Sequence, residues 1–483
     1  MKLKYLEQFS EMGLETPANG SIFGEFLPAR FLFAILANIG MAIVYGLKVN
    51  LSVTMVAMLN HTAIVGNKTE DTQSGQCDPP DGQSTTKPED GPFDWSEPLQ
   101  GMLLGCYFWG YLVSQIPLAY LAENYSAKWV FFFSVVLNVV CTILTPPLTK
   151  LHYAGLLTMR VLEGIAGGAS FPAMHIMIAN WAPQTERMLI ATIIYVGTSA
   201  GTASSILMSG LVSNKYGWEW VFYTMGGLSC IWIPLWIILI QDDPNKQRFI
   251  SPEERDMINT SLGHLEGAKE HPALPIAKVL KSIPFLAILI SHTCHNFGWY
   301  MFLIEIPFYM KQVLKFNVSS NAALSALPYI PYMIFSILLG KILDHLQNEG
   351  KINRTVARKI ANTFCTLVPA AALTGLCFIG CRHYFAVALM CIGIVAMGAA
   401  YSGFLSSHMD IAPKYAGMLM GMTNTVATIP GITVAQLVGF ITEGNQTIAA
   451  WRTIFSIAIV FFLIEFIVYT IFGSGEKQDW NDG

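Results

Sequence analysis

Long apolar runs recur along the chain and predict a protein that crosses a membrane many times. A helix needs about 20 mostly apolar residues to span the hydrocarbon core. About twelve runs meet this length, near residues 31–58, 97–122, 129–148, 153–179, 188–213, 218–240, 284–310, 322–345, 356–380, 384–405, 414–441 and 450–472. We therefore expect an all-α membrane protein with twelve transmembrane helices.

Two polar segments interrupt this pattern. Residues 59–96 are acidic and rich in Pro and Gly, which predicts a solvated loop, and residues 241–283 form a charged linker between two sets of six runs. The first residues lack the apolar core and cleavage site of a signal peptide. We expect a tail at 1–29, a six-helix half at 30–240, the linker at 241–283, a second half at 284–472 and a tail at 473–483.

Composition and charge agree with a membrane protein and orient it. The chain of 483 residues is 53% hydrophobic and 12% charged, about half the charged fraction of a soluble protein. Basic residues concentrate on the side that holds both termini, so this side is expected to be cytosolic. Asn60 and Asn67 then become glycosylation sites on the opposite side. The expected surroundings are a lipid bilayer, with no nucleic acid.

The cysteines do not form an obvious disulfide framework. Seven of the nine lie in the predicted spans, where cysteine is usually a small apolar packing residue. Cys77 lies in the outer loop and Cys381 at an outer edge. The sequence leaves open whether these two are bridged.

An internal repeat relates the two halves. The stretch "NWAPQTERMLIATIIYVGTSAG" at 180–201 aligns with "DIAPKYAGMLMGMTNTVATIPG" at 410–431 at a constant offset of 230 residues. Two six-helix halves in the same orientation predict the major facilitator fold. In that fold the substrate binds between the halves, which rock to expose it alternately on each side of the membrane.

Other classes of membrane protein fit less well. A seven-helix receptor has too few spans, and no loop resembles the selectivity filter of a channel. An enzyme is not expected, because no nucleophile elbow or phosphate-binding glycine loop is present. His292 and His295 have helical spacing but no third ligand near them in sequence, so no metal or other cofactor is expected.

A few ionisable residues fall inside the predicted spans, where an unpaired charge is costly. Arg160 and Glu163 share one helical face and can form an ion pair, which serves either function or helix packing. Lys48 adds a positive charge that this pair does not neutralise, which suits an anionic substrate. Glu305 and Glu465 are interpreted as packing or interfacial residues. Tyr107 belongs to an aromatic run that either lines the cavity or lies in the core or against lipid.

Several motifs resemble the anion:cation symporter family of the major facilitator superfamily. They are "YGLKVNLSV", "FWGYLVSQIP", "RVLEG" and "HMDIAPKYAGMLMGMTNTVATIPG". This family includes sialin, the vesicular glutamate transporters and the type 1 sodium-phosphate cotransporters. The resemblance is greatest to sialin-like proteins and to invertebrate inorganic phosphate cotransporters.

The resemblance implies roles for individual residues. Arg160 falls on the family's substrate-binding arginine, and Glu163 falls on a glutamate assigned to proton coupling. His175 matches a histidine of the same helix and is expected at the cytosolic exit or gate. Lys48 stands where the family has an arginine, and His295 lies near an arginine of the vesicular glutamate transporters. With Tyr107, these two complete the expected substrate-binding set.

We therefore expect a symporter for organic or inorganic anions that works by alternating access and is driven by H+ or Na+. A proton-coupled carrier of a monocarboxylate-like anion is the leading hypothesis. A sodium-dependent phosphate cotransporter is the alternative within the class, and an anion sensor that does not transport is the alternative outside it. A monomeric transport unit is expected in the plasma membrane or in a lysosomal or vesicular membrane.

Overall fold

The computed structural model describes residues 28–60, 77–80, 91–183, 186–262, 275–413 and 415–481. In this part of the chain the regular elements are helices, together with a single β-bridge between Leu59 and Phe93. The predicted all-α fold is confirmed. Residue Asn67, one of the two predicted glycosylation sites, lies outside the described residues.

The first half consists of six spans, some of which are broken into two helices. They are α3 (Ala29–Met58), α6 (Glu97–Asn124), α7 (Ala127–Leu151), α8 (Tyr153–Gly167) with α9 (Ser170–Trp181), α10 (Arg187–Tyr216), and α11 (Trp218–Cys230) with α12 (Trp232–Leu239). The linker carries η1 (Pro244–Lys246), α13 (Pro252–Leu262) and α14 (Ile276–Val279).

Broken helices are more frequent in the second half. Its segments are α15 (Ile283–Tyr300), η2 (Met301–Glu305) and α16 (Ile306–Gln312); α17 (Val318–Ala326) and α18 (Tyr329–Asn348); α19 (Arg354–Phe378); α20 (His383–Met397), η3 (Gly398–Tyr401) and α21 (Phe404–Ile411); α22 (Ala416–Val426) and α23 (Ile429–Ile441); and α24 (Ile448–Phe472). A short η4 (Asp479–Asn481) follows.

Eleven segments in the described ranges are long and apolar enough to cross a membrane. The twelfth predicted span is the seventh in order, where α15, η2 and α16 follow one another without a gap over 283–312. This segment is less apolar because it carries His292, His295 and Asn296, which face a cavity rather than lipid. Polar residues within a span are expected where they line such a cavity.

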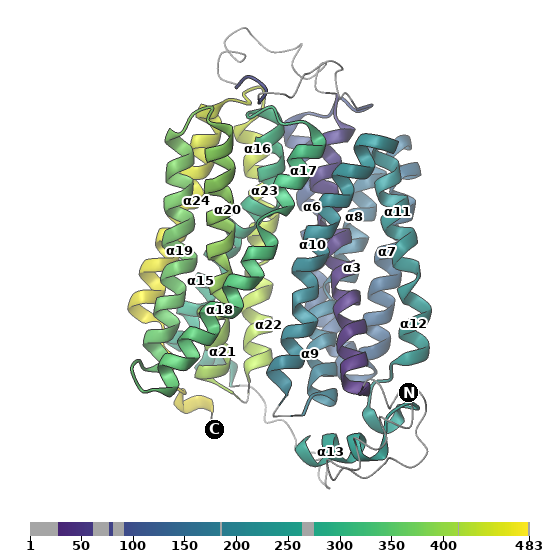
Figure 1. Cartoon of the computed structure of the whole chain (residues 1–483), viewed down its shortest axis with the longest axis vertical. Coiled ribbons are helices and arrows are strands. Elements are labelled where there is room, and N and C mark those ends of the chain that lie inside the picture. Colours follow the sequence, from purple (N-terminus) through teal and green to yellow (C-terminus); the bar gives the residue numbers. More distant parts are fainter. Residues whose placement is uncertain are drawn as a thin grey trace, which may run out of the picture.

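The two halves form two helical bundles that stand side by side (Figure 1). The end of the molecule that carries α13 is here called the linker face (Figure 1). The opposite end carries the bridge between Cys77 and Cys381 and is called the disulfide face. The connecting loops alternate between these two faces, as six spans per half require.

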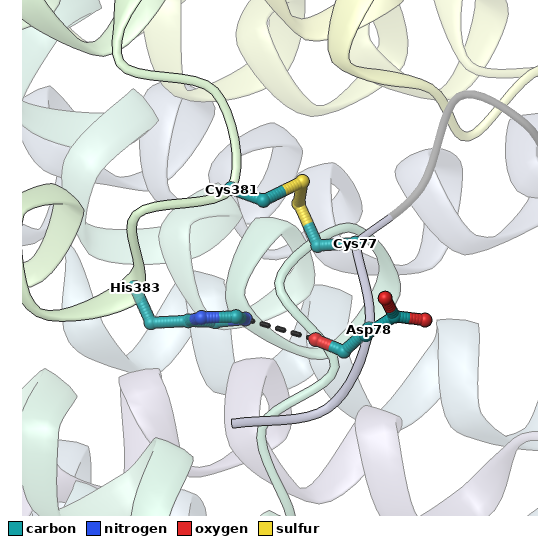
Figure 2. Close-up of a disulfide and its surroundings, with 4 residues drawn as sticks. All are labelled: Cys77, Asp78, Cys381 and His383. Carbon is teal, nitrogen blue, oxygen red and sulfur yellow. Dashed lines mark hydrogen bonds between the residues drawn. A yellow bond between two sulfur atoms is a disulfide. The ribbon is translucent and has the colours of Figure 1, made fainter. Parts of the chain in front are cut away.

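A disulfide connects the two halves and answers the question that the sequence left open. Cys77, in the loop after α3, is bonded to Cys381, between α19 and α20 (Figure 2). The Nε2 atom of His383 lies 3.0 Å from the carbonyl oxygen of Asp78 (Figure 2), and the backbone N–H of Cys77 donates to the carbonyl oxygen of Val313 at 3.0 Å. A segment of the first half is thereby fixed to the second half.

The halves pack closely on the side of the disulfide face, and glycines permit this contact. A Cβ atom on Gly101 of α6 would lie 2.2 Å from the carbonyl oxygen of Ala435 on α23. A Cβ on Gly210 of α10 would lie 2.0 Å from the Cβ of Ala322 on α17. Backbones approach this closely in membranes where the interface residues are small. The structure is therefore closed on the disulfide face.

Candidate functional site

A cavity of about 860 Å³ lies between the two halves and extends to the linker face. Helices of both halves line it, mainly α3, α6, α9 and α10 from the first and α15, α18 and α22 from the second. Its wall carries both polar and aromatic side chains, among them Tyr45, Lys48, Gln115, His175, His295 and Tyr300. A volume of this size is typical of small-molecule sites.

Lys48 lies at the closed end of this cavity inside a cage of aromatic rings. Its ammonium nitrogen lies between 4.8 and 5.5 Å from five ring centroids, those of Tyr45, Tyr107, Phe108, Tyr111 and Tyr300. The residue is only 7% exposed, and no carboxylate of the described residues lies within 4.0 Å of the nitrogen. A ring face stabilises a desolvated cation by about 2 kcal/mol or more. Among the described residues, Lys48 therefore has a cage of rings but no acidic partner.

Arg160 and Glu163 form the ion pair that their spacing predicts. Nη1 of Arg160 lies 2.6 Å from Oε2 of Glu163, and the hydroxyl of Thr142 donates to the other carboxylate oxygen at 2.8 Å. The arginine is 3% exposed and the glutamate 1%. A buried pair of this kind needs such additional hydrogen bonds to offset its loss of hydration.

The same arginine holds the backbone that carries Lys48. Its Nη1 donates to the carbonyl oxygen of Leu47 at 3.1 Å, and its Nη2 donates to that of Lys48 at 2.5 Å. Arg160 does not line the large cavity but borders a void of about 20 Å³ next to it, which Lys48 and Tyr107 also line. In this conformation the predicted arginine therefore positions the lysine, and Lys48 is the cation that the cavity reaches.

Tyr107 belongs to the aromatic cage rather than to the wall of the large cavity. Its hydroxyl has no hydrogen-bond partner among the described residues. A Cβ atom on Gly167 would lie 2.0 Å from this hydroxyl oxygen. The tyrosine thus occupies the space that a side chain at position 167 would need, which explains why this position is a glycine.

His175 lies on the cavity wall nearer the linker face. Its Nδ1 lies 2.8 Å from the hydroxyl oxygen of Tyr195 and 2.9 Å from the carbonyl oxygen of Phe171. It is separated from Arg160 by the break between α8 and α9, so these two residues have no contact. The sequence predicts this histidine at the cytosolic exit or gate, and that role remains a prediction.

His292 and His295 have separate partners. Nδ1 of His292 lies 3.1 Å from the hydroxyl oxygen of Thr423, which lies 2.8 Å from Nε2 of His408. His295 instead faces Glu465, with its Nδ1 3.4 Å from a carboxylate oxygen. The sequence favours a packing or interfacial role for Glu465, and no pattern in it connects α24 with α15 at this position.

Comparisons with known proteins identify the family of this chain. Residues 31–435 match the family model described as Major Facilitator Superfamily. The chain belongs to the major facilitator superfamily. It is 38% identical to human sialin, over 94% of this chain and 90% of that protein. It is 34% identical to the Drosophila melanogaster protein named "Putative inorganic phosphate cotransporter" (94% and 86% covered) and 33% identical to human vesicular glutamate transporter 2 (94% and 76% covered).

Solved structures of this superfamily have the same fold. A bacterial homologue of the human lysosomal transporter Spinster, in an inward-facing and unoccupied conformation, aligns with a TM-score of 0.67 and 14% identity, covering 92% of this chain and 98% of that one. A D-xylose-proton symporter aligns with a TM-score of 0.63 and 11% identity, covering 93% and 99%. The predicted major facilitator fold is confirmed, and the protein is a multi-pass membrane transporter whose relatives are named as transporters rather than enzymes.

One contact between the halves of this transporter was not predicted from the sequence. The side chain of Gln115 on α6 donates to the hydroxyl of Thr428 at 3.1 Å and accepts from the amide of Asn424 at 2.9 Å. Both partners lie in the second half, and Gln115 and Asn424 line the cavity. The cavity is thus crossed by neutral hydrogen bonds, which can exchange for water when the halves move apart.

Proposed function

We propose that this transporter is a secondary active symporter that moves an anion together with protons by alternating access. The observation that carries the proposal is Lys48, whose ammonium lies in an aromatic cage at the closed end of a cavity between the halves, with no acidic partner among the described residues. An anion that enters from the linker face would supply the missing negative charge. Buried charges are stable where they are paired, so the anion gains free energy at this site.

The lining of the cavity favours an organic anion. Aromatic rings from both halves, including Tyr45 and Tyr300, surround the lysine. Such rings pack against the apolar faces of a sugar or aliphatic acid, whereas a small inorganic ion has no such face. An acidic sugar or another monocarboxylate also fits a volume of about 860 Å³. Relatives named sialin and vesicular glutamate transporter support an anionic substrate.

Coupling to protons is proposed to run through Glu163. In the empty cavity its carboxylate pairs with Arg160, which also binds the carbonyl oxygen of Lys48. An anion at Lys48 would compete for the positive charge near this pair. Glu163 could then accept a proton and release Arg160 toward the anion. Loss of the proton on the other side of the membrane would restore the ion pair and expel the anion.

The test is transport by the purified protein in proteoliposomes under separately imposed gradients. Labelled glucuronate, glutamate and inorganic phosphate are offered with either a pH gradient or a sodium gradient. We expect the pH gradient alone to drive accumulation of an organic anion. Glu163→Gln should abolish this accumulation but keep exchange of labelled for unlabelled anion. Glu349→Gln, which changes an exposed carboxyl group paired with Lys351, is the matched control.

Other outcomes would contradict parts of the proposal. Accumulation of phosphate that requires sodium would favour the alternative function, which one relative's name supports. Binding of an anion without movement into the vesicles would make the protein a sensor. If Glu163→Gln still concentrates the anion when only a pH difference is imposed, the coupling role of this glutamate is wrong.

A further inference from the structure

Glu465 is a carboxyl group in the middle of the most apolar span. The most apolar 18-residue window of α24 has a mean hydropathy of 2.5, the highest among the eleven spans found in the described ranges. It packs against α15 and α19 (Figure 1), and the side chain of Glu465 is 0% exposed. An ionisable residue at such a place is costly and is usually part of a functional pathway.

The contacts of this carboxyl group leave it without a permanent counter-charge. One oxygen, Oε1, lies 3.4 Å from Nδ1 of His295 and accepts a weak hydrogen bond from the thiol of Cys365 at 3.7 Å. The other oxygen has no hydrogen-bond partner among the described residues. In the same part of the chain no lysine or arginine lies within 4.0 Å of it. Among the described residues, His295 is thus the group in contact with this carboxyl that can become a cation.

Other titratable groups near the pair are few. Besides His295, helix α15 carries His292 and Cys294, and α19 contributes Cys365. Helix α21 carries His408 and Asp410, and Asp410 is paired with Arg358 of α19. Helices α22 and α23, which also pack against α15, carry no acidic, basic or cysteine side chain. His292 and His408 both contact the hydroxyl of Thr423 rather than the carboxyl group.

The pair of Glu465 and His295 must hold one proton in this apolar environment. Without a fixed cation, an ionised Glu465 would be an uncompensated charge in an apolar interior, so a proton must reside on the carboxyl group or on His295. His295 lines the cavity and Glu465 lies behind it. The histidine therefore connects the buried carboxyl group with water that enters the cavity.

We propose that His295 and Glu465 form a second proton-binding site, located in the second half of the transporter. Glu465 holds the proton when the cavity is closed to water, and His295 exchanges it with the cavity when water enters. Its role as a coupling site rests on the proposed proton symport, but the presence of the proton site does not. Glu163 in the first half and Glu465 in the second then give each half its own proton carrier.

Infrared difference spectroscopy of the purified full-length protein in nanodiscs tests the site without any substrate. We expect a carboxyl C=O stretching band that appears and disappears with pH and is lost in Glu465→Gln. Cys365→Ser should shift this band, since the thiol hydrogen bond would be replaced, without removing it. Glu305→Gln is the matched control: it removes another buried carboxyl group that does not line the cavity, so the pH-dependent band should remain.

Transport measurements then test the coupling role. With two protons per monovalent anion, transport carries net positive charge, and a membrane potential set by valinomycin and potassium should alter uptake of glucuronate. Glu465→Gln should make this uptake insensitive to the potential while anion exchange continues. If the wild type shows no response to pH gradients at all, the proposed proton symport fails, while the titrating infrared band would still establish the site.

Two results would overturn the inference. Identical pH-dependent spectra of the wild type and Glu465→Gln would show that the carboxyl group does not exchange a proton. His295, Cys365 and Glu465 also offer ligand atoms within 4.8 Å of one another. Zinc found at one atom per protein by elemental analysis, and lost in Cys365→Ser, would replace the proton site with a metal site.

Discussion

The contact between Gly101 and Ala435 predicts that one added methyl group will change which face of the transporter is open. In Gly101→Ala the new Cβ would lie 2.2 Å from the carbonyl oxygen of Ala435. A carbon–oxygen contact needs roughly 3.3 Å. Helices α6 and α23 would therefore have to separate by about 1 Å on the side of the disulfide face, where the two halves are now closed.

The size of the effect follows from the cost of overpacking. Extra methyl or methylene groups in a tight contact cost about 1–3 kcal/mol. This cost falls on the conformation closed at the disulfide face and is relieved when the halves separate there. About 1.4 kcal/mol corresponds to a tenfold change in an equilibrium constant. The ratio of the conformation open on that face to the conformation closed there should therefore rise roughly 5- to 150-fold.

Hydrogen–deuterium exchange followed by mass spectrometry measures this shift in nanodiscs. We expect faster exchange in Gly101→Ala for peptides from the start of α6 and the end of α23, and slower exchange in α9 and α22 at the linker face. Gly421→Ala is the matched control, because a Cβ atom on this glycine of α22 would meet nothing within 4 Å. If both variants exchange alike, or if exchange in Gly101→Ala rises on both faces, the reasoning is refuted.

Three further predictions concern the lysine, the disulfide and the orientation. Lys48→Met keeps the size of the side chain but removes its charge, so apparent anion affinity should fall at least tenfold in the proteoliposome assay; an unchanged affinity would remove this lysine from the site. A double variant with Cys77→Ser and Cys381→Ser should show faster deuterium exchange at residues 77–80 and unchanged exchange in the helices that line the cavity. Changed exchange in those helices would mean that the disulfide determines which face of the transporter is open. Treatment with a glycosidase should change the gel mobility of protein made in eukaryotic cells. The change should be lost in the double variant Asn60→Gln with Asn67→Gln. An unchanged mobility of the wild type would show that neither asparagine carries a glycan.

The spans could be predicted because membrane helices are governed by length and apolarity. About 20 mostly apolar residues suffice to cross the hydrocarbon core. The breaks within spans were less accessible to prediction. The fourth span ends its first helix at Gly167 and resumes at Ser170, and the seventh contains the π-helical turn Met301–Glu305. Close contacts with other helices occur at such a break: a Cβ atom on Gly168 would lie 2.2 Å from the hydroxyl oxygen of Ser114 on α6.

The candidate site was predictable only where its residues are close in sequence. Arg160 and Glu163 are one turn apart, so their ion pair follows from helical spacing. The cage around Lys48 draws rings from α3, α6 and α15, and the contact of His295 with Glu465 joins α15 to α24. No local periodicity relates such distant segments, since their proximity is a property of how the helices pack.

The two buried cations of the first half differ in what balances their charge, and this difference connects the anion with the proton. Arg160 is balanced by Glu163 and by backbone carbonyl oxygens, whereas Lys48 is surrounded only by rings. We therefore propose that an entering anion gains most of its free energy at Lys48. Because Arg160 donates a hydrogen bond to the backbone carbonyl oxygen of Lys48, a shift of the α3 backbone at Lys48 would also displace the arginine. The arginine in turn holds the carboxylate of Glu163, so the three residues form a continuous chain from the substrate cavity to the proposed proton site.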